Sequence, residues 1–367
     1  MKNYRCHCGN TIYFENTRCL ACDRSLGFLP DSMQMAAFAL QSDGLWQALS
    51  PAGQGRYRQC ANYARENVCN WMVAADDHHA YCRACRLNHI IPDLGDPQNR
   101  VLWMRIERAK RRLLYTLLAL RLPVVGRDQD AQHGLAFEFL AEQSWNTEFT
   151  DLSGAQNVLT GHRDGLITIN IAEADPIARE RMRERMREQY RTLLGHFRHE
   201  IAHYYWDRLV RNTGWLEECR ARFGDERRDY TRTLASYYAE GPRPDWQQSY
   251  ISAYASAHPW EDFAETWAHY LHMVDTLETS HHFGFAVAGR AVRPPAAALA
   301  GEVQRAQALS HPPLTFDDLL ADWTQLTLAM NALNRSMGLD DAYPFALSAP
   351  ASDKLAFVHR LIAASAA

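Results

Sequence analysis

The sequence predicts an α+β protein that is mainly helical, carries a small sheet, and begins with a small cysteine-rich head. Eight of the nine cysteines precede residue 86, whereas apolar residues recur at helical spacing over long stretches of the remainder. Only a few short segments alternate apolar and polar residues as a half-buried strand does. We therefore divide the chain into a head, residues 1–95, and a body, residues 96–367, whose C-terminal part is helical.

Composition excludes several classes of protein. The 367 residues suffice for one large domain or two to three smaller ones. A net charge of -4 provides no field that would attract nucleic acid or an anionic membrane. No segment approaches the roughly 20 apolar residues of a membrane-spanning helix, and the N-terminus lacks the apolar core of a signal peptide. We expect a cytoplasmic protein without a nucleic-acid or membrane partner, whose cysteines bind metal rather than form disulfides.

The cysteines of the head form two sets with the spacing of zinc ligands. In the first set, a C-x-C pair and a C-x-x-C pair suit two short turns that present four thiolates to one tetrahedral ion at about 2.3 Å. The second set has one C-x-x-C pair and two more widely spaced cysteines. Because four thiolates leave no open coordination position, both sites are expected to be structural and to stabilise a short segment. The first set is Cys6, Cys8, Cys19 and Cys22, and the second is Cys60, Cys69, Cys82 and Cys85.

The body opens with a long helix, predicted from residue 99 because apolar residues recur there at helical spacing without an interrupting Gly or Pro. Two strands follow, at residues 135–140 and 165–175, the second with isoleucines at alternate positions. The charged stretch after them is predicted to be one long helix, or two helices with a joint near Gly195.

The C-terminal half is predicted to be mostly helical. A polar segment at residues 213–246 separates the charged stretch from a pattern that is helical on both sides of Pro259. From residue 281 onward, proline-containing loops alternate with further helical patterns.

A His-Glu-x-x-His sequence at residues 199–203 lies inside the charged helical stretch. Its imidazoles, His199 and His203, stand one helical turn apart on one face, where both can reach one metal ion at about 2.0–2.1 Å. Glu200 can accept a proton from a metal-bound water and later pass it to a leaving amine. This pattern is typical of zinc-dependent peptidases, so we predict a catalytic zinc with Glu200 activating the zinc-bound water.

A catalytic zinc needs a third protein ligand and an open fourth position. The helical segment EDFAETWAH, 58 residues after His203, offers two carboxylates one turn apart, Glu261 and Glu265. Either carboxylate can complete a site of two histidines and one glutamate. The residue pattern by itself leaves the choice between them open.

These motifs resemble the gluzincin class, and the catalytic part is similar to bacterial toxin peptidases of the anthrax lethal factor type. The resemblance implies that Glu261 is the third zinc ligand and that Glu265 is the second choice, or orients a histidine ligand. It also puts a tyrosine seven residues before the ligand glutamate, where Tyr254 stands in this sequence. The Tyr254 hydroxyl would then stabilise the developing oxyanion.

Over nearly its whole length, the sequence resembles the bacterial family of zinc-binding metallopeptidases that carry an N-terminal zinc ribbon. The similarity rests on both cysteine sets and on segments such as CRACRLNHIIPDL, GHRDGLITINIAEAD and YRTLLGHFRHEIAHYYWDRL. It implies a zincin-like metallopeptidase domain preceded by a zinc-ribbon head, with one catalytic and two structural zinc ions.

The predicted function is therefore hydrolysis of peptide bonds in a peptide or protein substrate. The strand near Ile167 to Ile171 would align the substrate backbone, and the head would bind a protein partner or dock the substrate. The alternative is a catalytically inactive adaptor, in which the zinc ribbon binds a protein and the zincin fold serves as scaffold. The intact Glu200 argues against this alternative.

Overall fold

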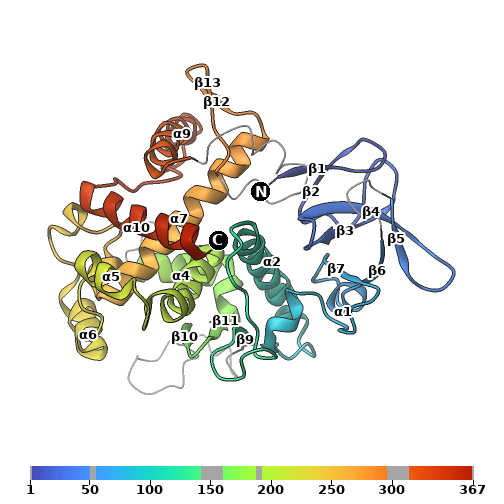
Figure 1. Ribbon diagram of the computed structural model, residues 1–367, viewed down its shortest axis with the longest axis horizontal. Coiled ribbons are helices and arrows are strands. Elements are labelled where there is room, and N and C mark those ends of the chain that lie inside the picture. The colour runs from blue at the N-terminus through green and yellow to red at the C-terminus, as the bar shows by residue number, and fades with distance from the viewer. Residues whose placement is uncertain (1, 50–54, 142–159, 187–191, 296–313, 366–367) are drawn as a thin grey trace.

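A β-rich head stands beside a mainly helical body, with helix α2 (Pro97–Ala119) between them, as Figure 1 shows. The predicted mixture of many helices with small sheets is therefore observed. Within the described residues, no helix is both long and apolar enough to cross a membrane. This computed structural model describes residues 2–49, 55–141, 160–186, 192–295 and 314–365.

The head consists of a two-stranded hairpin and a five-stranded antiparallel sheet. The hairpin strands β1 (Asn3–Arg5) and β2 (Thr11–Tyr13) flank the turn that carries the first two cysteines. A bridge from Phe28 to Trp71 brings the first strand of the sheet beside the last, so the sheet curls toward a closed barrel. The sheet strands in order are β3 (Ser25–Leu29), β4 (Gln34–Leu40), β5 (Trp46–Ala48), β6 (Arg56–Gln59) and β7 (Met72–Ala74), with the short helix α1 (Ala61–Ala64) between the last two.

The alternation that predicts a strand is missing from the first two strands of this sheet, which explains why the sequence analysis does not anticipate it. Strands β3 and β4 each bury four consecutive residues, because both of their faces are covered. Part of the cover comes from the body. The rings of Phe14 and Phe28 lie 5.3 and 6.0 Å from the ring of Tyr115 in α2.

Helix α2 confirms the helix predicted from residue 99. Asp96 caps it by accepting a hydrogen bond from the Gln98 N–H at 2.8 Å, and Pro97 occupies the first helical position. On its other side the helix reaches the body, where the Tyr115 hydroxyl donates to the Glu278 carboxylate at 2.8 Å. Head and body thus share one hydrophobic core.

The body contains a four-stranded sheet of order β10-β11-β9-β8, in which only β10 runs antiparallel to its neighbour. Both predicted strands of the body are present, although the second ends at Asn170 instead of at residue 175. The prediction that the strand near Ile167 to Ile171 aligns a substrate is wrong, because β11 is hydrogen-bonded to β10 on one side and β9 on the other. The bounds are β8 (Asn88–Ile90), β9 (Ala136–Leu140), β10 (Gly161–Arg163) and β11 (Leu166–Asn170), and a short 3₁₀ helix (Ile171–Ala174) follows.

The charged stretch forms two helices rather than one, α3 (Pro176–Met186) and α4 (Leu193–Tyr205). Thr192 caps α4 by accepting a hydrogen bond from the Gly195 N–H at 3.0 Å, so α4 begins just before Gly195, close to the predicted joint. The segment predicted as polar contains two helices, α5 (Leu216–Phe223) and α6 (Tyr230–Glu240).

Helix α7 (Pro259–His282) crosses the body beside α4. Pro259 starts this helix, and the segment just upstream forms two 3₁₀ turns (Trp246–Gln248 and Tyr254–Ser256) rather than an α-helix, so the prediction of helix on both sides is correct downstream alone. The start of α7 is held by a buried ion pair, in which Lys354 Nζ lies 2.6 Å from Asp262 Oδ2. The remaining elements of the described residues are β12 (Ala286–Val287), β13 (Arg290–Ala291), α9 (Phe316–Ser336), α10 (Ala349–Ser365), a 3₁₀ helix (Cys85–Leu87) and a π-helical turn (Trp206–Val210) that follows α4.

Candidate active site and metal centres

The crossing of α4 and α7 brings two histidines and a glutamate together. His199 and His203 lie one turn apart on α4, with ring centroids 5.0 Å from each other. From the first turn of α7, Glu261 Oε2 reaches to 2.9 Å from His199 Nε2 and 3.8 Å from His203 Nε2. Ligand atoms about 3.3 Å apart are expected around a tetrahedral ion with bonds of about 2.0–2.1 Å. The two observed separations bracket that value.

The burial of this group also fits a metal ion. Glu261 is 1% exposed and His203 is 4% exposed, yet Glu261 Oε2 has no hydrogen-bond partner among the described residues. A buried carboxylate oxygen without a hydrogen bond is costly unless a cation binds it. Burial also lowers the pKa of His203 to about 3, which keeps its imidazole neutral, the form that binds metal.

Glu265 lies on the other side of the His199 ring. Its Oε1 is 2.7 Å from His199 Nδ1, and its Oε2 accepts a hydrogen bond from Ser252 Oγ at 2.6 Å. A proton on Nδ1 shared with this carboxylate leaves the Nε2 lone pair directed at Glu261. Of the two carboxylates left open by the sequence, the geometry therefore favours Glu261 as the metal ligand and Glu265 as the residue that orients His199.

Replacing Glu265 with alanine is expected to weaken zinc binding at this group by about 10–100-fold, because His199 loses the partner that fixes its ring. Glu265→Gln should retain most of the affinity, since its amide oxygen can still accept from Nδ1. Competition with a chromogenic chelator measures the affinity. A loss as complete as in His199→Ala would instead make Glu265 a ligand, and no loss would leave it without an orienting role.

Glu200 is buried beside the same group. It is 8% exposed, and its Oε2 has no hydrogen-bond partner in the part of the chain that the structure describes. Burial raises the pKa of this carboxyl to about 7. A carboxyl with a pKa near neutrality can both accept and donate a proton, as a general base and acid must.

Two tyrosines lie near the histidines, of which the sequence predicts one. The ring of Tyr254 is 5.9 Å from the ring of His199, so the structure brings the predicted residue to the site. The other is Tyr230, whose hydroxyl donates to Glu261 Oε1 at 2.7 Å and thereby leaves Oε2 for the histidines. Tyr230 precedes Glu261 by 31 residues, in the segment predicted as polar, and no sequence signal identifies it.

Edge strand β10 also reaches the group. The ring of its middle residue, His162, lies 6.2 Å from that of His203, and Trp260 packs against His203 with ring centroids 4.0 Å apart. The His162 Nε2 atom accepts a hydrogen bond from the Gly165 N–H at 3.0 Å. The sequence analysis does not predict this hairpin, although an Asp-Gly pair is a hairpin signal. In the structure, Asp164 and Gly165 form the turn, and both have positive φ angles.

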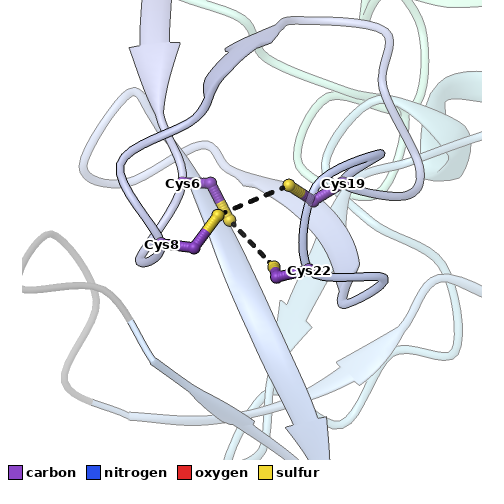
Figure 2. Close-up of side chains that lie close together, drawn as sticks. All are labelled: Cys6, Cys8, Cys19 and Cys22. Atoms are coloured by element: carbon purple, nitrogen blue, oxygen red, sulfur yellow. Dashed lines mark hydrogen bonds between the residues drawn. The ribbon is translucent and has the colours of Figure 1, made fainter.

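Both cysteine sets come together as predicted. In the first set, shown in Figure 2, the sulfur atoms of Cys6 and Cys22 are 3.7 Å apart, as are those of Cys8 and Cys19. Four thiolates around zinc are expected at about 3.8 Å from one another, whereas a disulfide bond is about 2.05 Å long. All four sulfurs of each set lie within 4.8 Å of one another, in the second set those of Cys60, Cys69, Cys82 and Cys85.

The second cysteine set is built into the junction of head and body. All four of its cysteines are buried, whereas Cys8 of the first set is exposed. Backbone N–H groups of Trp71 and Cys82 donate to sulfurs of the set at 3.4 Å. On the α2 side, the buried guanidinium of Arg111 lies near the set. Burial alone would lower the pKa of Arg111, but the charge of Cys69 and its neighbours raises it overall. Helix α2 thus supplies positive charge beside the thiolates.

Comparisons with known proteins follow the same division of the chain. The model of the family described as "Putative zinc-binding metallo-peptidase" matches residues 99–361, and that of a zinc-ribbon domain matches residues 3–96. The chain is 38% identical over 364 residues to uncharacterized proteins of Mycobacterium bovis and Mycobacterium tuberculosis, covering 99% of this chain and 95% of each relative. Among the solved structures none gives a significant match.

Proposed function

The chain belongs to the zinc-binding metallo-peptidase family whose model it matches, and we propose that it is a zinc-dependent peptide-bond hydrolase of the gluzincin kind with a zincin-like body. One observation carries the proposal. The ligand atoms of His199, His203 and Glu261 lie within 4.8 Å of one another, next to the buried carboxylate of Glu200. The substrate would be a peptide or protein, and the full complement would be three zinc ions, one catalytic and two structural.

The residues around this group have the properties that peptide hydrolysis requires. Zinc bound there would polarise the substrate carbonyl and acidify a water molecule. Glu200 takes a proton from the attacking water and returns it to the leaving amine. Tyr254 donates a hydrogen bond to the oxyanion that develops on the carbonyl oxygen. Tyr230 holds Glu261, and Glu265 holds His199, so that neither ligand turns away during the reaction.

We assign alignment of the substrate backbone to β10 in place of β11. In the two-residue hairpin, Arg163 and Leu166 form the closing hydrogen-bonded pair, so the next pair, His162 and Ile167, is not hydrogen-bonded. The backbone N–H and C=O of His162 therefore point away from β11, toward the side of β10 on which the described residues place no partner strand. An extended peptide can add to such an edge through main-chain hydrogen bonds, close to His203.

Metal content tests this proposal directly. Elemental analysis is expected to give three zinc ions per chain for the wild type and two for His199→Ala, because each of the three groups holds one ion. A peptide library is expected to be cleaved by the wild type and to remain intact with His199→Ala. Two zinc ions in both proteins, without cleavage, would contradict the peptidase and favour the catalytically inactive adaptor.

A further inference from the structure

Helix α6 lies near the metal group without contributing to the core. None of its residues is buried, in contrast to α4 and α7 on either side of the histidines. Its tyrosines stand at positions 230, 237 and 238, spaced by seven and eight residues, which puts them on one face of the helix. The first of them is fixed to the site by the hydrogen bond from Tyr230 to Glu261. The tyrosine face of α6 is therefore turned toward the metal group.

The other two tyrosines continue this aromatic surface. The ring of Tyr237 is 5.7 Å from that of Tyr254, and the ring of Tyr238 is 5.6 Å from that of Tyr237. Tyr254 in turn lies 5.9 Å from His199. The three rings of Tyr237, Tyr238 and Tyr254, here named the tyrosine wall, thus lead from a proposed zinc ligand outward along α6.

The fold leaves the wall accessible to solvent. Tyr238 is 58% exposed, and Tyr237 and Tyr254 are partly exposed. Aromatic rings gathered on an exposed face beside a reactive centre are typical of a binding surface. Because an aromatic ring buries a large area and prefers edge-to-face contact with others, rings at these spacings suit another aromatic ring.

Charge also favours an uncharged occupant. Two carboxylates act on the wall at Tyr254, where Glu261 and Glu200 raise the pKa of the hydroxyl after the larger effect of burial. A divalent cation held by the histidines and Glu261 would offset both of these negative charges, so neither of them would attract a cationic side chain to the wall.

We propose that the tyrosine wall binds an aromatic side chain of the substrate next to the scissile bond, which makes Tyr237 and Tyr238 determinants of cleavage specificity. The inference rests on the proposed function, since it requires zinc at the neighbouring group. Tyr237 is the better test, because it stands between Tyr254 and Tyr238. Tyr237→Phe keeps the ring and should keep the preference, whereas Tyr237→Ala removes the middle of the wall.

Binding of three small hydroxamates to the zinc-loaded protein, measured by calorimetry, separates the wall from the metal. Phenylpropanohydroxamic acid is expected to bind wild type and Tyr237→Phe about tenfold or more tightly than propanohydroxamic acid does, in line with the discrimination of an apolar pocket. In Tyr237→Ala, the ratio of the affinity for phenylpropanohydroxamic acid to that for propanohydroxamic acid should fall to about two or less. The affinity for propanohydroxamic acid itself should stay unchanged. Tyr13→Ala, an exposed tyrosine of the head, is the matched control and should behave as wild type.

Three outcomes would overturn the proposal. The first is an equal affinity for the phenyl and methyl compounds in wild type, and the second is a preference that survives Tyr237→Ala. The third is that aminohexanohydroxamic acid binds the wild type more tightly than phenylpropanohydroxamic acid does, which would make the wall a cation site. A different result would be that propanohydroxamic acid binds neither the wild type nor any variant. That result would argue against zinc at this group, and so against the proposed function as well as the tyrosine wall.

Discussion

Replacing Glu200 with glutamine is expected to lower kcat by about 10²–10⁴-fold while the protein keeps three zinc ions per chain. The amide has nearly the same shape as the carboxylate but cannot accept a proton from water. Glu200 is not one of the three residues whose ligand atoms converge on the metal position, so the metal should stay bound. A fluorogenic peptide chosen from the library gives kcat, and elemental analysis gives the metal content of the same sample.

Glu217→Gln is a matched control for this prediction. The Glu217 side chain is 85% exposed on α5 and pairs with Arg220, so the same chemical change occurs far from any proposed role. It should leave kcat and zinc content unchanged. Undiminished cleavage by Glu200→Gln would exclude the carboxylate as the base, and loss of the third zinc ion would mean that Glu200 helps to hold the metal.

Replacing Cys82 with serine is expected to remove one zinc ion and to unfold much of the chain, body included. A structural Zn²⁺ contributes about 10–16 kcal/mol in small zinc domains, comparable to the whole stability of a typical protein. Cys82 is 1% exposed, and its set adjoins α2, which packs against both head and body. The cooperative thermal transition, followed by circular dichroism in the presence of zinc, should be lost or shifted sharply downward.

Cys8→Ser provides the comparison, because Cys8 is the exposed member of the peripheral set. This variant should also lose one zinc ion, yet keep a cooperative transition closer to that of the wild type. Equal behaviour of the two variants would show that burial in the shared core does not distinguish the sets. A Cys82→Ser protein that unfolds like the wild type would contradict a structural role for the second zinc.

The shared core changes how the head is best understood. The sequence suggests a separate module that binds a partner, whereas Phe14 and Phe28 of the head pack on Tyr115 of α2. The same tyrosine is hydrogen-bonded to Glu278 on α7, the helix that carries Glu261. The head therefore supports the helices of the proposed active site, whatever else it binds.

The sequence by itself determined the parts of this protein whose geometry is local. Two histidines four residues apart in a helix must share a face, and C-x-C or C-x-x-C pairs on tight turns must point their sulfurs together. The long helix α2 and the strands β9 and β11 could likewise be predicted, because each shows its own periodicity. For these features, neighbours along the chain set the spatial arrangement.

Only the tertiary structure decided which distant groups meet. Glu261 and Glu265 are one turn apart on the same face of α7, and the crossing of α7 over α4 alone directs the first to His199 Nε2 and the second to Nδ1. Tyr230 reaches Glu261 because the chain between α4 and α7 folds back, and β11 becomes an inner strand because β10 pairs with it. These contacts depend on helix crossing and strand pairing between distant segments, and neither leaves a periodic signal in the sequence.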